Sequence, residues 1–226
     1  MKDLTVIFLT LNRLPKAFAD YHEDLLLKAA GDYPLICISR VPMSLEENVV
    51  DTSEIGYINV YRQLLRGAKL ARTPYVAVAE DDTLYCPEHF NFYRPALDTF
   101  AYNQNRWALF TWGVPTYSMR QRKSNCSLIA PRELMIAALE ERFEKYPGYS
   151  MPAEWVGELG RARVDKWLGV TIRKSIEVYS ETSIIQFNHS LALAERQRRK
   201  RKSLGQIKAF DVPYWGTANE LAGRFK

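Results

Sequence analysis

The stretch Thr73-Pro74-Tyr75-Val76-Ala77-Val78-Ala79-Glu80-Asp81-Asp82 decides the fold of this chain, because its apolar run delivers three consecutive acids where a strand should end. Residues 75–79 combine β-branched, aromatic and small side chains after Pro74, which is typical of a short strand buried on both faces. Three adjacent carboxylates repel one another, so a divalent cation is the simplest stabilising partner. A solvated acidic turn is the alternative interpretation.

Strand-like and helix-like segments alternate on the N-terminal side of this stretch. Residues 4–10 form a compact apolar run followed by a helical pattern to about Lys28, and residues 35–39 form a second apolar run. Between Tyr57 and Ala71, apolar residues recur at helical spacing. The opposite, polar face of that helix is expected to carry Arg62, Gln63, Arg66 and Lys69. This alternation predicts an α/β sandwich with a mostly parallel central sheet, in which ligands gather at the carboxyl ends of the strands.

The pattern is less regular after Pro87. Residues 107–113 and 126–130 are predicted as strands, and residues 132–146 as an amphipathic helix that begins after Pro131. Further strand-like runs follow at 177–179 and 184–187. We expect one domain over residues 1–190, followed by a basic peripheral arm over residues 191–226.

Composition narrows the class of protein. No apolar span among the 226 residues is long enough for a transmembrane helix, and no signal-peptide pattern is present, so we expect a soluble cytoplasmic protein. Cys37, Cys86 and Cys126 are odd in number and widely spaced, which predicts buried free thiols and neither a disulfide framework nor a zinc site.

All of the net positive charge lies in one short run. The chain carries +5, and six cations fall in seven consecutive positions, so the remainder carries −1. These cations are Arg196, Arg198, Arg199, Lys200, Arg201 and Lys202. Such a run is an electrostatic footprint for a polyanion, either nucleic acid or an anionic membrane surface. A solvated basic segment without a partner is the alternative.

Three features then resemble a known family. They are Thr10-Leu11-Asn12-Arg13 after the first strand, the helix of residues 59–71 with Arg62, Gly67 and Ala68, and the strand of residues 75–79 leading into the acids. Together they resemble a nucleotide-sugar glycosyltransferase of the GT-A fold, close to the family-2 type. The acids are similar to its Asp-X-Asp motif, with Glu80 as a departure at the first position. The likeness covers most of the first hundred residues and continues more loosely to His189.

The resemblance implies a GT-A-like, Rossmann-type α/β/α sandwich with a donor-nucleotide half over residues 1–100 and an acceptor half over residues 101–190. It also implies Mn²⁺ or Mg²⁺ and a nucleoside-diphosphate sugar, with a UDP-sugar as the expected donor. Asp82 is the first implied metal ligand, and His189 is an implied ligand of the metal or the diphosphate, with a structural role as its alternative. The implied donor-binding residues are Thr10, Asn12, Arg13, Arg62, Glu80 and Asp81. Within this set, Glu80 would contact the ribose, and Asp81 would support the metal or the donor sugar.

An inverting transferase needs a general base near the acceptor hydroxyl. Asp165 is the first candidate, because it precedes His189 in the order that the family shows, and Glu154 and Glu158 are the alternatives. A surface ion pair with Arg163 or Lys166 is the other interpretation of Asp165.

The acceptor is the most open question. The basic run and a general likeness to phage-type transferases favour DNA that carries a 5-hydroxymethylpyrimidine. A cell-envelope glycan or lipid-linked saccharide, with the basic run on anionic phospholipid, is the alternative, and a non-catalytic nucleic-acid-binding protein is a different class. Tyr214 and Trp215 either stack on exposed bases or pin the tail. We expect His22 and His89 to be structural. The aromatic residues expected to form core or pocket walls are Tyr102, Trp107, Phe110 and Trp112.

Overall fold

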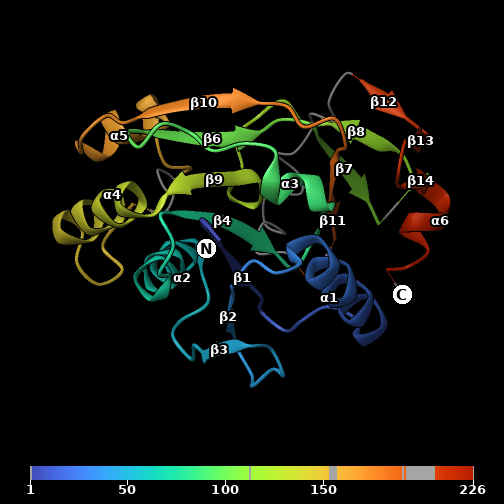
Figure 1. Ribbon diagram of the computed structural model, residues 1–226, viewed down its shortest axis with the longest axis horizontal. Helices are drawn as coiled ribbons and strands as arrows, with labels where there is room; N and C mark the ends of the chain where they lie inside the picture. The colour runs from blue at the N-terminus through green and yellow to red at the C-terminus, as the bar shows by residue number, and fades with distance from the viewer. Residues whose placement is uncertain (1, 112, 153–156, 190, 192–206, 226) are drawn as a thin grey trace.

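The computed structural model describes residues 2–111, 113–152, 157–189, 191 and 207–225, and Figure 1 traces the chain through them. The six cations of the basic run, together with Glu154 and Trp112, lie outside the described residues. No helix in the described part of the chain has both the length and the apolar character needed to cross a bilayer. Cys37, Cys86 and Cys126 are buried free thiols, as predicted.

Among the described residues, a seven-stranded sheet forms the centre of the molecule. Its spatial order is β10 (Lys174–Val178), β6 (Thr99–Asn103), β9 (Leu128–Pro131), β4 (Tyr75–Glu80), β1 (Leu4–Leu9), β2 (Leu35–Ser39) and β3 (Glu47–Val50). Strands β4, β1, β2 and β3 run parallel, β6 and β10 are parallel to each other, and β9 is antiparallel to both of its neighbours. The predicted α/β class with a mostly parallel central sheet is confirmed.

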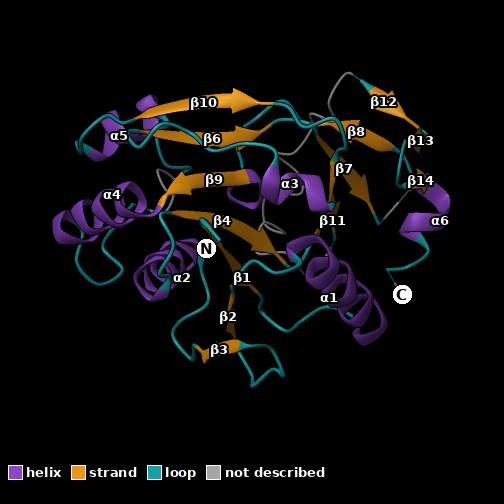
Figure 2. Cartoon of the chain, in the orientation of Figure 1, coloured by secondary structure: helices purple, strands orange, loops and turns teal. Residues whose placement is uncertain are grey.

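Helices cover both faces of this sheet, as Figure 2 shows. Helices α2 (Tyr57–Leu70) and α4 (Arg132–Lys145) pack on one face through one hydrophobic cluster. Helices α1 (Lys16–Ala30) and α3 (Pro87–Asn91) pack on the other face through a second cluster. Gly67 lets α2 approach β1 closely, because a Cβ atom there would lie 2.6 Å from Cγ2 of Ile7.

A second sheet continues from the end of β4. Its order is β12 (Lys208–Ala209), β8 (Tyr117–Met119), β7 (Arg106–Phe110), β11 (Ile184–Asn188) and β5 (Thr83–Leu84). Strands β7 and β11 are parallel, and β5 pairs antiparallel with β11. Because β5 follows β4 after two turn residues, the second sheet places β11 beside the acidic turn.

Several details differ from the sequence-based expectation. Strands β6, β9 and β10 of the expected acceptor half join the central sheet, whereas β5 of the donor half joins the second sheet, so the two halves interleave. Residues 207–225 pack on the second sheet through β12 and a hydrophobic cluster that includes α6 (Ala218–Ala222), and β13 (Asp211–Val212) pairs with β14 (Gly216–Thr217) beside it. This described part of the tail is therefore integrated into the fold.

Candidate functional site

The three acids project from the carboxyl end of the central strand β4 into a cavity. Glu80 is the last residue of β4, and Asp81 and Asp82 form the turn to β5. All three line a cavity of about 380 Å³, a size usual for small-molecule sites. The cavity lies where parallel strands end, which is where this fold class binds ligands.

Asp81 is fixed by the end of strand β1. The Oγ1 hydroxyl of Thr10 donates to Oδ2 of Asp81 at 2.7 Å, and the backbone N–H of Leu11 donates to the same oxygen at 3.2 Å. Thr10, predicted as a donor-binding residue, thus contacts the acidic turn directly. Asn12 has a different position: its backbone φ is +52°, and its Oδ1 accepts hydrogen bonds from the backbone N–H groups of Arg40 and Val41. Asn12 thus ties the ends of β1 and β2 together and does not line the cavity.

Asp82 is held by strand β11 and by its own neighbour. Oγ1 of Thr83 donates to Oδ1 of Asp82 at 2.9 Å, and Nε2 of Gln186 donates to Oδ2 at 3.4 Å. The backbone N–H of Phe187 donates to the Asp82 carbonyl at 2.7 Å. The turn thus has its carboxylate and its backbone bound to one strand, which limits the positions that the carboxylate can take.

His22 supports the same turn from helix α1. Its Nε2 lies 3.1 Å from the carbonyl oxygen of Glu80 and 2.9 Å from that of Thr83. Burial lowers the pKa of His22 to about 4, so the ring is neutral at neutral pH. His22 is structural, as predicted, and the backbone that it holds is that of the acidic turn.

Burial and mutual repulsion disfavour ionisation of the acids. Burial, with the charges of Asp82 and Asp81, raises the pKa of Glu80 to about 8. Burial also raises the pKa of Asp81 to about 6, against the hydrogen bond from Thr10. A cation in the cavity would reverse this effect, because it favours the ionised carboxylates.

His189 follows β11 and lines the cavity with the acids. Its Nδ1 atom is buried and has no hydrogen-bond partner among the described residues, and burial lowers the pKa of the ring against the opposing charge of Asp81. The described residues contain no group of three or more His, Cys, Asp or Glu side chains able to hold a metal ion. Mg²⁺ and related ions are commonly held by one or two carboxylates plus substrate phosphates, so Asp82 and an unsatisfied imidazole nitrogen fit a metal shared with a ligand.

Cations line the cavity as well. Arg13, predicted to bind the donor, is among the lining residues, and so are Arg122 and Arg161, which were not predicted. Arg62 is not: its guanidinium lies over the rings of Phe143 and Tyr149 and donates to the carbonyl of Gly148. The predicted donor contact of Arg62 is therefore not supported by its position, because it points toward the end of α4.

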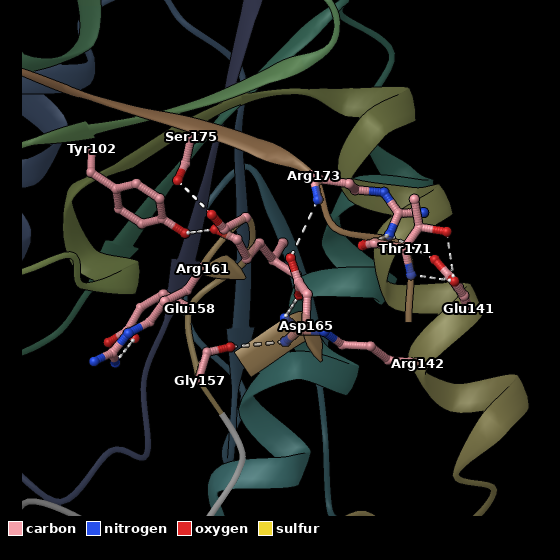
Figure 3. Close-up of polar contacts among 12 residues, drawn as sticks. Tyr102, Glu141, Arg142, Gly157, Glu158, Arg161, Asp165, Thr171, Arg173 and Ser175 are labelled. Carbon is pink, nitrogen blue, oxygen red and sulfur yellow. Dashed lines mark hydrogen bonds and ion pairs between the residues drawn. The ribbon is translucent and has the colours of Figure 1, made fainter. Parts of the chain in front are cut away.

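Asp165 does not lie in the cavity. Its side chain is buried in an ion pair with Arg142, whose Nη2 lies 2.8 Å from its Oδ1, and the two side chains are 3% and 1% exposed. Figure 3 shows this pair beside the segment that carries Gly157 and Glu158. A carboxylate bound in this way does not reach an acceptor hydroxyl, which corrects the prediction of Asp165 as the base, and its ion pair is neither of the surface pairs considered above.

Glu158 lines the cavity and forms an ion pair with Arg161, with a 3.1 Å separation between Oε2 and Nη1. Three carbonyl groups around it accept hydrogen bonds: that of Gly157 from Arg142 at 2.8 Å, that of Leu159 from Tyr102 at 2.7 Å and that of Gly160 from Ser175 at 2.6 Å (Figure 3). Arg142 thus connects Asp165 to the backbone beside Glu158. Among the candidate bases that the structure describes, Glu158 alone reaches the cavity.

A buried polar cluster that contributes to the cavity lining was not predicted from the sequence. Asn59 and Gln63 of α2 line the cavity, and their amide groups donate to Oδ2 of Asp51 at 2.9 and 2.7 Å. Burial raises the pKa of Asp51, but the hydrogen bonds from Ser53, Asn59 and Gln63 bring it down to about 2. Gln63 is 5% exposed, which corrects its placement on the polar face of the helix. Asn59 and Gln63 lie four residues apart among apolar residues of the helix. This spacing of two amide side chains was the signal in the sequence that could have predicted the buried cluster.

The aromatic residues are mainly structural. Tyr102 is buried in the core, and none of Tyr102, Trp107 and Phe110 lines the cavity. Nε1 of Trp215 donates to the carbonyl of Ser183 at 2.7 Å, which pins the tail, whereas the Tyr214 side chain is exposed. His89 is buried, with Nδ1 3.1 Å from Nδ2 of Asn103.

No protein-family model and no curated protein sequence matches the chain. Solved structures do resemble it in fold. Glycosyltransferases are among them. One is a glycosyltransferase involved in the glycosylation of the major capsid of PBCV-1, with 12% identity over 89% of this chain and 100% of that chain, and a TM-score of 0.46. Another is the catalytic domain of Drosophila β1,4-galactosyltransferase 7 in complex with xylobiose, with 12% identity over 100% of this chain and 81% of that chain, and a TM-score of 0.42.

A nucleotidyl transferase from Methanothermobacter thermautotroptrophicus is similar to the same degree, with 12% identity over 80% of this chain and 89% of that chain, and a TM-score of 0.46. Similarity at this level concerns the fold, so function has to be argued from the cavity.

Proposed function

We propose that this protein is a metal-dependent glycosyltransferase that moves a sugar from a nucleoside-diphosphate sugar, with UDP as the expected nucleotide, to a hydroxyl group. One observation carries the proposal: within the described residues, acids, arginines and an imidazole nitrogen with no hydrogen-bond partner converge in one cavity at the carboxyl end of parallel strands. A diphosphate with a divalent cation complements such a set of charges, whereas an apolar ligand does not.

Asp82 and His189 would hold Mn²⁺ or Mg²⁺ together with oxygens of the diphosphate. When bound, such an ion neutralises the charge that develops on the departing diphosphate. Within the chain, Asp81 keeps its orientation through Thr10, and Glu80 is the residue that we assign to the ribose. Arg13 lines the same cavity and supplies positive charge toward the diphosphate.

We assign the general base to Glu158. In an inverting displacement its carboxylate accepts the proton of the acceptor hydroxyl, while the hydroxyl oxygen bonds to the anomeric carbon and the bond to the diphosphate breaks. The three hydrogen bonds to the neighbouring carbonyls hold the backbone on both sides of this carboxylate. Such support is what a base requires, since its efficiency depends on its distance to the proton.

For the acceptor we propose 5-hydroxymethylpyrimidine in DNA. The support is the sequence of the basic run, six cations in seven positions, which suits the phosphate backbone of a nucleic acid. The target base would leave the stack so that its hydroxyl reaches the cavity. Binding should weaken steeply with salt, with a log–log slope of about −0.9 for each neutralised phosphate on duplex DNA.

The proposal is tested by incubating the protein with UDP-sugars, Mn²⁺ and either hydroxymethylated or unmodified DNA, and by measuring nucleoside masses after digestion. We expect a hexose or pentose increment on the hydroxymethylated base alone, and its loss in Glu158→Gln and Asp82→Asn. Transfer to a cell-envelope glycan, with sedimentation on anionic liposomes, would overturn the DNA acceptor but keep the transferase. DNA binding that is unchanged in Asp82→Asn, without hydrolysis of any donor, would overturn the transferase itself.

A further inference from the structure

Arg106 is a buried cation with no ion pair to a carboxylate in the described part of the chain, although its charge lies near enough to Glu80 to oppose the rise in the pKa of that carboxyl. It begins strand β7, its side chain is fully buried, and it forms no ion pair with any carboxylate among the described residues. Its Nε atom has no hydrogen-bond partner in this part of the chain. Burying a guanidinium is costly unless nearby charges and hydrogen bonds compensate for its loss of hydration, so the position of this cation requires an explanation.

The guanidinium of Arg106 forms hydrogen bonds with two residues that line the cavity. Nη1 of Arg106 donates to Oε1 of Gln186 at 2.5 Å, and Nη2 donates to the carbonyl of Arg122 at 3.0 Å. Gln186 and Arg122 both line the cavity, whereas Arg106 does not. The arginine therefore bridges strand β11 and the loop after β8 without contacting the cavity itself.

Gln186 links Arg106 to the acidic turn, because its side chain contacts both Arg106 and Asp82. Its Oε1 accepts from Arg106, which orients the amide so that Nε2 faces Asp82, 3.4 Å from Oδ2. The antiparallel register pairs Gln186 with Thr83, the residue after Asp82, so the strand fixes the amide beside the carboxylate. An amide that is already bound to a cation through its oxygen is a stronger donor through its nitrogen, because consecutive hydrogen bonds polarise one another.

We propose that Arg106 is a positioning residue that acts through Gln186 to orient the Asp82 carboxylate for a divalent cation. Partners of this kind around metal ligands commonly change metal affinity by about 10- to 100-fold when they are removed. This inference rests on the proposed function, because it takes Asp82 as a ligand of the metal that the donor needs.

The experiment measures the affinity of Mn²⁺ in the presence of UDP by electron paramagnetic resonance of the free ion, so that it does not depend on turnover. Gln186→Met removes both ends of the relay while keeping the length of the side chain, and we expect Mn²⁺ affinity to fall about 10- to 100-fold. Arg106→Lys keeps the charge but loses the two-armed geometry, and we expect a smaller loss.

The matched control is Gln104→Met, which alters a buried glutamine outside the cavity lining, and we expect its Mn²⁺ affinity to match the wild type. Arg106→Lys combined with Gln186→Met should bind Mn²⁺ no more weakly than Gln186→Met alone, because the arginine acts through the glutamine. Thermal unfolding of each variant checks that it is folded, and Gln186→Met, at a partly exposed position, remains informative if Arg106→Lys does not fold.

Two negative results are distinguishable. If the wild type binds Mn²⁺ with UDP and Gln186→Met binds it equally well, or if the effects of the two substitutions simply add, the relay is refuted and the proposed function stands. If the wild type does not bind Mn²⁺ with any nucleoside diphosphate, the proposed function fails and the inference fails with it.

Discussion

Neutralising Glu80 should stabilise the metal-free protein by an amount that grows as the pH rises from about 5 to 8. The folded state raises the pKa of Glu80 from 4.5 to about 8, through burial and the neighbouring charges of Asp82 and Asp81. Below pH 4.5 Glu80 is protonated in both the folded and the unfolded chain. Between pH 4.5 and 8 the unfolded chain loses this proton while the folded protein keeps it, so the free energy of unfolding falls as pH rises.

The size of this effect follows from the two pKa values. The interval from 4.5 to about 8 corresponds to at most about 5 kcal/mol, at about 1.36 kcal/mol per pH unit. Because glutamine resembles the protonated acid, the advantage of Glu80→Gln over the wild type should grow from about 1 kcal/mol at pH 5 to about 4 kcal/mol at pH 8.

Urea unfolding in the presence of EDTA at pH 5, 6, 7 and 8 measures this difference. Glu46→Gln is the control, since Glu46 is exposed and its replacement should leave the pH dependence of the wild type unchanged. Parallel stability curves for the wild type and Glu80→Gln over this pH range would refute the idea that the acidic turn is held under electrostatic strain.

Three further substitutions test the support of the cavity, each by urea unfolding at pH 7. Arg142→Met leaves Asp165 buried without its cation and should lower the free energy of unfolding by about 3–5 kcal/mol. The double variant Arg142→Met with Asp165→Leu should recover most of this loss, and an equal loss in the single and the double variant would contradict the role of the buried ion pair. Gly160→Ala should lower the free energy of unfolding by about 2–4 kcal/mol, because φ is +68° and the new Cβ would lie 2.9 Å from the carbonyl oxygen of Lys174. Its control is Gly148→Ala, where φ is also positive, at +62°, but no atom lies within 4 Å of the new Cβ, so the loss should be about 1 kcal/mol. His22→Leu removes the partner of two turn carbonyls and should cost about 1–3 kcal/mol, and an unchanged stability would mean that the turn holds itself.

The inner strands β1, β2 and β4 were predictable, because they are largely buried on both faces and are therefore continuous apolar runs, whereas β6 is also buried and was not predicted. Residues 35–39 and 75–79 were predicted as strands and are β2 and most of β4, and the helix predicted over residues 57–71 is α2. Strand β3 was missed, because as an exposed edge strand it carries polar residues and has no apolar periodicity. Strand β5 has two residues, too few for a pattern.

The candidate site was predictable where its residues are contiguous in sequence. The acidic triplet and Thr10 were found because they follow strands directly, whereas Arg106, Gln186 and Asp51 act through partners 8 to 104 residues away. Such pairs depend on register and on the second sheet, which short sequence patterns do not encode. Asp165 was assigned as base from its order along the chain, and order does not reveal the buried arginine that binds it.

The central claim is that the cavity binds a nucleoside diphosphate together with a metal held by Asp82. The most direct measurement is thermal unfolding of the wild type and Asp82→Asn with UDP, GDP or CDP, each with and without Mn²⁺. At 100 times the dissociation constant a ligand stabilises the native state by about 2.7 kcal/mol, which raises the melting temperature of a chain of this size by about 5–10 °C. We expect that rise for the wild type with UDP and Mn²⁺ together, and not for Asp82→Asn. No rise with any nucleotide, or an equal rise in the variant, would contradict the account.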